Sequence, residues 1–262
     1  MLKEILQTAE VAGYLWEKGW AERNGGNITV NVTDSLDEAT KKLPAIAGPF
    51  AIGMKLEHLK GCFFYCKGTG KRMRDLARDP MANGSIIRIC EGCESYEIIA
   101  EQAVMPTSEL PSHLAIQDYL IATGTDYKAT LHTHPIELVA MSHSSRFLDS
   151  KYLTNLLWSM IPETLAFAPL GIGVAPYSLP GSVSLAEATL KLIERYDVVL
   201  WEKHGTIAVG RDIIEAFDQT DVLNKAAIIY MIGRNMGFEP EGMTASAVKE
   251  VREVFSLPDK RG

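Results

Sequence analysis

Segments with the patterns of strands and helices alternate along the whole chain, and this alternation constrains the fold more than any single motif. Strand-like runs such as Ile28–Val32 and Val198–Trp201 are separated by helix-like runs such as Glu109–Ala122 and Ile213–Met236. We find no linker, low-complexity tract or internal repeat. The pattern is typical of an α/β protein, and we expect one domain over residues 1–262.

Shorter segments complete the expected pattern. Apolar residues recur every three or four positions from Leu2 to Trp16, which predicts a helix ending near Gly19. Residues 34–49 are predicted to form a loop or a short helix. Further strands are expected at Phe50–Met54, Cys62–Cys66, Ile86–Ile89, Ala129–His134, Leu165–Ala168, Gly173–Ala175 and Thr206–Val209.

Charge and apolar content restrict the classes of partner. The 262 residues carry 26 basic and 33 acidic side chains, a formal net charge of −7. A nucleic-acid-binding face needs excess positive charge, so we expect no nucleic-acid partner. No apolar run reaches the roughly 18–20 residues of a membrane helix, so we expect no membrane partner and a cytoplasmic location. In that reducing compartment Cys62, Cys66, Cys90 and Cys93 are expected to be free thiols.

Three histidines have a spacing that suits a metal ion. His132 and His134 flank Thr133 in a predicted strand, and alternate strand residues point to the same side. His204 follows the strand Val198–Trp201, and strand ends are where α/β proteins build sites. Three protein ligands and one open position are typical of a catalytic zinc ion. The alternative is a set of polar residues without a metal.

Two carboxylates are candidates for acid–base chemistry. Glu109 follows Thr107 and Ser108 at the start of a predicted helix, and Glu163 lies between a predicted helix and a predicted strand. A carboxylate beside a metal ion can act as a general base. The alternative for Glu109 is an acid that favours the helix dipole, and its spacing alone favours that interpretation. The alternative for Glu163 is an exposed loop acid.

Two glycine-containing loops have the composition of anion sites. They span Asn24–Asn27 and Gly68–Lys71, and Thr107 and Ser108 add further donors. Glycines let backbone N–H groups approach an anion closely, although ordinary turns use the same residues. The chain lacks the phosphate-loop, dinucleotide and serine-hydrolase signatures, which disfavours nucleotide-binding and serine-hydrolase functions.

Taken in order, these motifs resemble the class II aldolase/adducin family. The matching pieces are Trp20–Thr29, Gly68–Lys71, Pro106–His113, His132–His134 and His204–Gly205, and the resemblance extends from the first helix to about Gly210. It implies a single domain with a central, mainly antiparallel sheet flanked by helices on both faces. It also implies reversible aldol cleavage of a sugar phosphate and a homotetrameric assembly.

The resemblance also implies roles for individual positions. One zinc ion per subunit would be held by His132, His134 and His204. Glu109 would be the catalytic acid and base, and Glu163 would act at the aldehyde end, in its own or a neighbouring subunit's site. Binding of the phosphate and triose would fall to Asn24, Gly26, Asn27, Thr69, Gly70, Thr107 and Ser108.

Within the family, the motifs around Asn24 and Glu109 are typical of members that cleave L-rhamnulose 1-phosphate to dihydroxyacetone phosphate and L-lactaldehyde. Alternatives on the same fold are cleavage of L-fuculose phosphate and 4-epimerisation of a pentulose phosphate. Alternatives of another class are a zinc hydrolase and a non-catalytic, adducin-like scaffold. Two departures stand out: Thr69 replaces a serine that is frequent in relatives, and residues 34–60 match no segment that we can place.

Overall fold

The computed structural model describes residues 1–99 and 102–258, and the chain divides into two compact units. The first unit comprises Met1–Thr133 and Val209–Ile214, and the second comprises His134–Ala208 and Glu215–Gly262. The single catalytic domain expected from the sequence stays a prediction.

The described strands form a nine-stranded sheet with the order β2-β5-β4-β3-β1-β6-β9-β8-β7. All strand pairs with a defined register are antiparallel except β7–β8, which is parallel. The predicted α/β class with a mainly antiparallel sheet is therefore confirmed. The strands are β1 (Asn27–Asn31), β2 (Ala47–Ala51), β3 (Phe63–Lys67), β4 (Gly84–Ile89), β5 (Ser95–Ile98), β6 (Ala129–Thr133), β7 (Ile172–Ala175), β8 (Val198–Trp201) and β9 (Gly205–Gly210).

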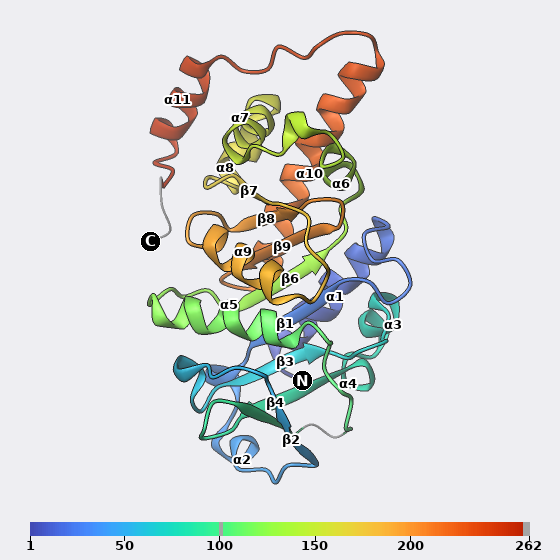
Figure 1. Cartoon of the computed structure of the whole chain (residues 1–262), viewed down its shortest axis with the longest axis vertical. Helices are drawn as coiled ribbons and strands as arrows, with labels where there is room; N and C mark the ends of the chain where they lie inside the picture. Colours follow the sequence, from blue (N-terminus) through green and yellow to red (C-terminus); the bar gives the residue numbers. More distant parts are fainter. Residues whose placement is uncertain (100–101, 259–262) are drawn as a thin grey trace. The chain divides into compact units, whose positions relative to one another are not determined.

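Helices flank the strands in both units (Figure 1). In the first unit they are α1 (Lys3–Glu17), η1 (Thr33–Ser35), α2 (Glu38–Lys41), η2 (Glu57–Leu59), α3 (Met73–Arg78), α4 (Pro80–Asn83) and α5 (Leu110–Ala122). The later helices are α6 (Ile136–Met141), η3 (Ser145–Phe147), α7 (Ser150–Met160), α8 (Pro162–Phe167), α9 (Val183–Ile193), α10 (Ile213–Asn235) and α11 (Ala245–Val254). Within the described ranges, none of these helices combines the length and apolar character needed to cross a lipid bilayer.

Helix α1 buries only part of the apolar stripe that its sequence suggests. Ile5, Val11 and Leu15 are buried, and the helix packs against α3. Leu6 and Trp16 are 55% and 41% exposed, and the Arg74 guanidinium lies 5.0 Å from the Trp16 ring centroid. Apolar periodicity thus predicts the helix correctly, but the packing partner decides which part of that stripe is buried.

Three expectations about strands are wrong. The predicted strand Leu165–Ala168 belongs largely to α8, because Pro162 opens this helix at a position where its missing N–H breaks no helical hydrogen bond. Strand β2 covers Ala47–Ala51 instead of the expected Phe50–Met54, and it pairs with β5, which was not expected. All five β2 residues are exposed or half-buried, as suits the edge of the sheet, so this strand lacks the apolar run that marks central strands.

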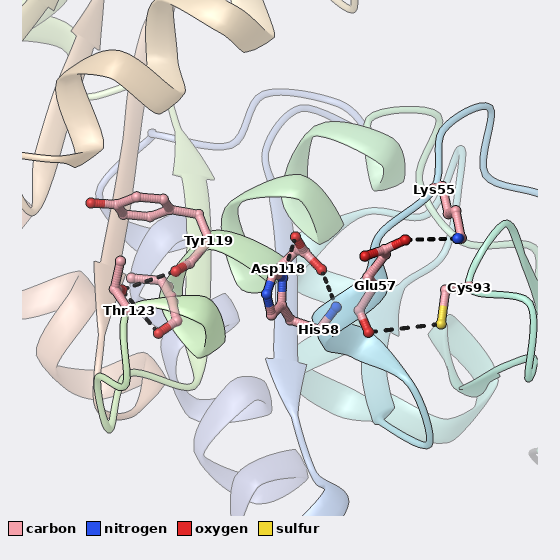
Figure 2. Close-up of polar contacts among 8 residues, drawn as sticks. Lys55, Glu57, His58, Cys93, Asp118, Tyr119 and Thr123 are labelled. Atoms are coloured by element: carbon pink, nitrogen blue, oxygen red, sulfur yellow. Dashed lines mark hydrogen bonds and ion pairs between the residues drawn. The ribbon is translucent and has the colours of Figure 1, made fainter.

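Helix α5 fixes the position of the segment that carries Glu109. It packs against β1 and β6 (Figure 1). Gln117 donates a hydrogen bond of 2.8 Å to the Thr130 hydroxyl. This cover explains why four of the five β1 residues are buried, although their alternation predicted only one buried face. Figure 2 shows a second anchor, in which the His58 backbone N–H donates to Asp118 Oδ1 at 2.8 Å and His58 Nδ1 lies 3.1 Å from Asp118 Oδ2.

Candidate active site

The structure brings the three predicted metal ligands together. The ligand nitrogens of His132, His134 and His204 lie within 4.8 Å of one another. His132 is buried on β6, His134 directly follows that strand, and His204 lies in the turn between β8 and β9. The imidazole rings of His134 and His204 have centroids 5.4 Å apart, and the Trp201 ring lies 5.2 Å from that of His204.

This histidine group fits a zinc ion in chemistry and in size. Points at most 4.8 Å apart share a centre no more than about 2.8 Å from each, so small side-chain rotations reach the Zn–N distance of about 2.0–2.1 Å. Neutral imidazole is a common zinc ligand, and other divalent transition metals accept the same donors. Three protein ligands leave a coordination position for substrate oxygen atoms.

Glu109 is held beside the strand that pairs with His132. The Asn27 side-chain amide donates a hydrogen bond of 2.6 Å to Glu109 Oε2. In the ladder between β1 and β6, Asn27 is the register partner of His132. Glu109 occupies the N-cap position of α5, but its side chain makes no capping hydrogen bond. Its carboxylate therefore has a specific partner in Asn27, in addition to its place at the N-terminal end of the helix dipole.

Three of the predicted anion-binding residues line one cavity. Thr69, Thr107 and Ser108 border a space of about 420 Å³ in the first unit. The remaining lining is mostly apolar and consists of Ala51, Ile52, Tyr96, Met105, Pro106, Leu110 and Pro111. Ala51 and Ile52 come from the stretch 34–60, so this stretch supplies one wall of the cavity. The polar hydroxyls against an apolar wall suit a small ligand with one anionic group.

The two glycine positions serve different structural needs. Gly26 has a φ of +75°, and a Cβ atom there would lie 3.0 Å from the main-chain oxygen of His132. A side chain at this position would press on β6 beside the histidine group. Gly70 has a φ of +68°, and a Cβ atom there would meet no atom within 4 Å. Gly70 is therefore explained by the turn itself.

The structure leaves Glu163 outside these clusters. Glu163 is exposed in the first turn of α8, and this helix packs against α7 and α11. The neighbouring Thr164 hydroxyl donates to the main-chain oxygen of Val222 at 3.3 Å. These contacts explain the position of α8 and assign no chemical role to Glu163.

The sequence interpretation missed a buried lysine. Lys67 ends β3 and is 1% exposed, and its ammonium donates a hydrogen bond of 3.0 Å to the main-chain oxygen of Asn24. Burial lowers the pKa of Lys67 to about 8, and the negative charge of Glu109 opposes that shift. The one sequence signal is its position, directly after a run of apolar strand residues and directly before the second glycine loop.

His113, in helix α5, is also buried. Its side chain is 0% exposed, and within residues 1–99 and 102–258 neither ring nitrogen has a hydrogen-bond partner. Burial, followed by the charge of Lys67, lowers the pKa of His113 to about 3. The imidazole is therefore neutral at neutral pH.

Substituting His113→Leu should make the protein less sensitive to acid. The pKa of this group falls from 6.5 to about 3 on folding, so the unfolded chain binds more protons below pH 6.5. The wild type should lose about 1.4 kcal/mol of unfolding free energy per pH unit through this residue as the pH falls from 6.5 towards 3, and the variant should lack this contribution. Urea unfolding at pH 7 and pH 5 would measure it, and equal losses in both proteins would contradict it.

Comparison with known proteins places the fold and the motifs in a family. The model of the class II aldolase and adducin N-terminal domain matches residues 7–231. A rhamnulose-1-phosphate aldolase from Bacteroides thetaiotaomicron is 60% identical over 258 residues, which cover 98% of this chain and 96% of that protein. A rhamnulose-1-phosphate aldolase from Enterococcus faecalis is 31% identical over 265 residues, with coverage of 100% and 93%.

Solved structures agree with this placement. A sugar-phosphate aldolase from Thermotoga maritima matches with a TM-score of 0.79 and 33% identity, over 92% of this chain and 98% of that chain. An L-fuculose 1-phosphate aldolase shares the fold, with a TM-score of 0.62 and 18% identity over 98% of both chains. Because the family model and these relatives cover most of its length, the chain belongs to the class II aldolase and adducin family.

Proposed function

We propose that this chain is a zinc-dependent aldolase that reversibly cleaves L-rhamnulose 1-phosphate to dihydroxyacetone phosphate and L-lactaldehyde. The observation that carries the proposal is the 60% identity, over 98% of the chain, to a protein named rhamnulose-1-phosphate aldolase. The group of three histidines and the Asn27–Glu109 hydrogen bond support it, because an aldolase without a Schiff-base lysine needs a Lewis acid and a proton-transfer group.

Cleavage removes a proton from the hydroxyl group on the carbon that becomes the aldehyde and adds a proton to the carbon released from it. Candidate residues exist for the stabilisation of charge and for the second of these proton transfers. A zinc ion held by His132, His134 and His204 would supply Lewis-acid stabilisation of the negative charge that carbon–carbon cleavage leaves next to a carbonyl. Glu109 delivers a proton to that carbon in the cleavage direction and removes the same proton in synthesis. The Asn27 amide holds one oxygen of this carboxylate and so restricts its orientation.

The remaining assignments complete the proposal. Thr69, Thr107 and Ser108 bind the phosphate from the cavity that they line. The family resemblance, rather than the lining of this cavity, supports a contribution from the loop Asn24–Asn27, which includes Gly26, and from Gly70. The family resemblance further supports one zinc ion per chain, a homotetramer, and action of Glu163 at the aldehyde end of its own or a neighbouring copy's site.

A coupled assay for dihydroxyacetone phosphate tests the substrate. We expect kcat/KM for L-rhamnulose 1-phosphate to exceed that for L-fuculose 1-phosphate by at least about tenfold, since one altered group in a fitted pocket discriminates on that scale. Oxidation of NADH by an added glycerol-phosphate dehydrogenase reports the triose phosphate. A reversed preference would reject the proposed sugar, and absence of triose phosphate from both substrates would reject the aldolase reaction.

A further inference from the structure

Lys67 is a buried cation that the proposed reaction does not use. It is the last residue of β3 and is among the largest side chains that are almost completely shielded from solvent. A buried ammonium group is costly unless polar or charged partners compensate it. The contacts of Lys67 show where that compensation comes from.

Lys67 joins two segments that carry candidate site residues. Its ammonium donates to the main-chain oxygen of Asn24 at 3.0 Å, and its own main-chain oxygen accepts a hydrogen bond of 3.0 Å from the Thr107 N–H. Two residues further on, the Thr69 N–H donates to the main-chain oxygen of Met105 at 2.8 Å. One residue therefore connects the loop Asn24–Asn27 with the turn that leads from Thr107 to Glu109.

The positive charge of Lys67 also interacts with the ionisable groups of Glu109 and His113. The negative charge of Glu109 favours the protonated amine, and the positive charge of Lys67 disfavours protonation of His113. An ammonium group has three N–H donors. In the part of the chain that the structure describes, the acceptor for Lys67 Nζ is the Asn24 oxygen alone. Donors therefore remain for an anionic ligand.

We propose that Lys67 is a positioning residue for the anionic substrate. Its ammonium ties the loop Asn24–Asn27 to the turn Thr107–Glu109, and it adds a buried positive charge to an anion site otherwise built from hydroxyl, amide and backbone donors. The inference rests on the proposed function and deepens it, because it names the cation that offsets the charges of the phosphate and of Glu109.

The test replaces Lys67 by Met, which keeps an unbranched side chain as far as Cε and removes the charged group with its donors. We expect KM for the ketose phosphate to rise at least about tenfold, with a smaller fall in kcat. We also expect inorganic phosphate to lose its ability to raise the melting temperature, while the metal content stays unchanged. The melting temperature without ligand reports separately on the fold, because removing one partner of a buried pair leaves the other partner uncompensated.

Two further variants make the result specific. Lys67→Gln keeps a donor that can reach towards the Asn24 oxygen but carries no charge, so it should also lose protection by phosphate. It serves in place of the Met variant if that variant does not fold. Lys60→Met is the matched control, since Lys60 is 63% exposed and pairs with Glu91 at 2.9 Å. It should leave KM and phosphate protection unchanged.

The outcomes separate this inference from the proposed function. The inference would be overturned if, in Lys67→Met, both KM and the rise in melting temperature caused by phosphate stay within twofold of the wild-type values. It would also be overturned if phosphate does not raise the melting temperature of the wild type. A lower melting temperature with unchanged KM would show a structural role only, and would also overturn it. If the wild type releases no triose phosphate but is protected by phosphate through Lys67, the aldolase proposal fails and the role of Lys67 stands.

Discussion

Replacing Glu109 by Gln should lower kcat by about 10²–10⁴-fold, the range that a positioned acid–base group contributes. Glutamine has nearly the same shape and still offers an oxygen atom to the Asn27 amide, which donates to Glu109 at 2.6 Å. It cannot exchange a proton with the substrate carbon. The fold and the histidine group should therefore persist while proton transfer is lost.

Steady-state kinetics and metal analysis on the same preparation separate the possible roles of Glu109. Unchanged metal content with low turnover supports the acid–base role, whereas loss of the metal would identify Glu109 as a ligand. Near-normal turnover would contradict both roles. Glu94→Gln is the matched control, because Glu94 is exposed just before β5 and should tolerate the same exchange without effect.

Replacing His204 by Ala should reduce metal affinity by at least about 100-fold. The reason is that losing a residue that only hydrogen-bonds to a metal ligand already lowers the affinity by about 10–100-fold. The same result is expected for His132→Ala, since both nitrogens belong to the group confined within 4.8 Å. Turnover should fall with the metal, because the Lewis acid is lost. Treating the wild type with a strong chelator should reproduce the loss, and added zinc should restore activity.

Metal analysis after dialysis against a weak chelator provides the readout for these histidine variants. His143→Ala serves as the control, because His143 is an exposed histidine of the same unit as His204. It should retain about one ion per chain, as the proposed three-ligand site requires. Full retention of the metal in His204→Ala would refute the ligand assignment, whatever happens to the activity.

The parts of the site that the sequence predicts are those governed by local geometry. His132 and His134 are two residues apart on a strand, and His204 follows a strand end, so period and position suffice to suggest that they converge. Lys67 and His113 were not assigned in this way, because their burial depends on segments distant in sequence. The hydrogen bond of Lys67 joins residues 67 and 24, and no local sequence pattern predicts it.

The same distinction holds for the fold. The periodicity of α1 predicts a helix, but contact with α3 decides that Ile5 is buried and Leu6 is exposed. Strand β5 has alternate residues buried, which is a strand pattern, but with four residues it is too short to stand out in the sequence. The need for glycine at position 26 is evident only in the structure, because a Cβ atom there would lie close to the main-chain oxygen of His132.

Because the position of Asn27 depends on how β1 pairs with β6, enzyme activity reports whether these two strands have paired correctly. Asn27 stands opposite His132, and its side chain reaches Glu109 only in this alignment. A slip of one residue would turn Asn27 to the opposite face of the sheet, and would separate the acid–base group from the strand that carries the first metal ligand. Misaligned chains would thus be inactive even if compact. The active fraction of a purified, metal-loaded sample should therefore not exceed the fraction of molecules that paired these two strands correctly.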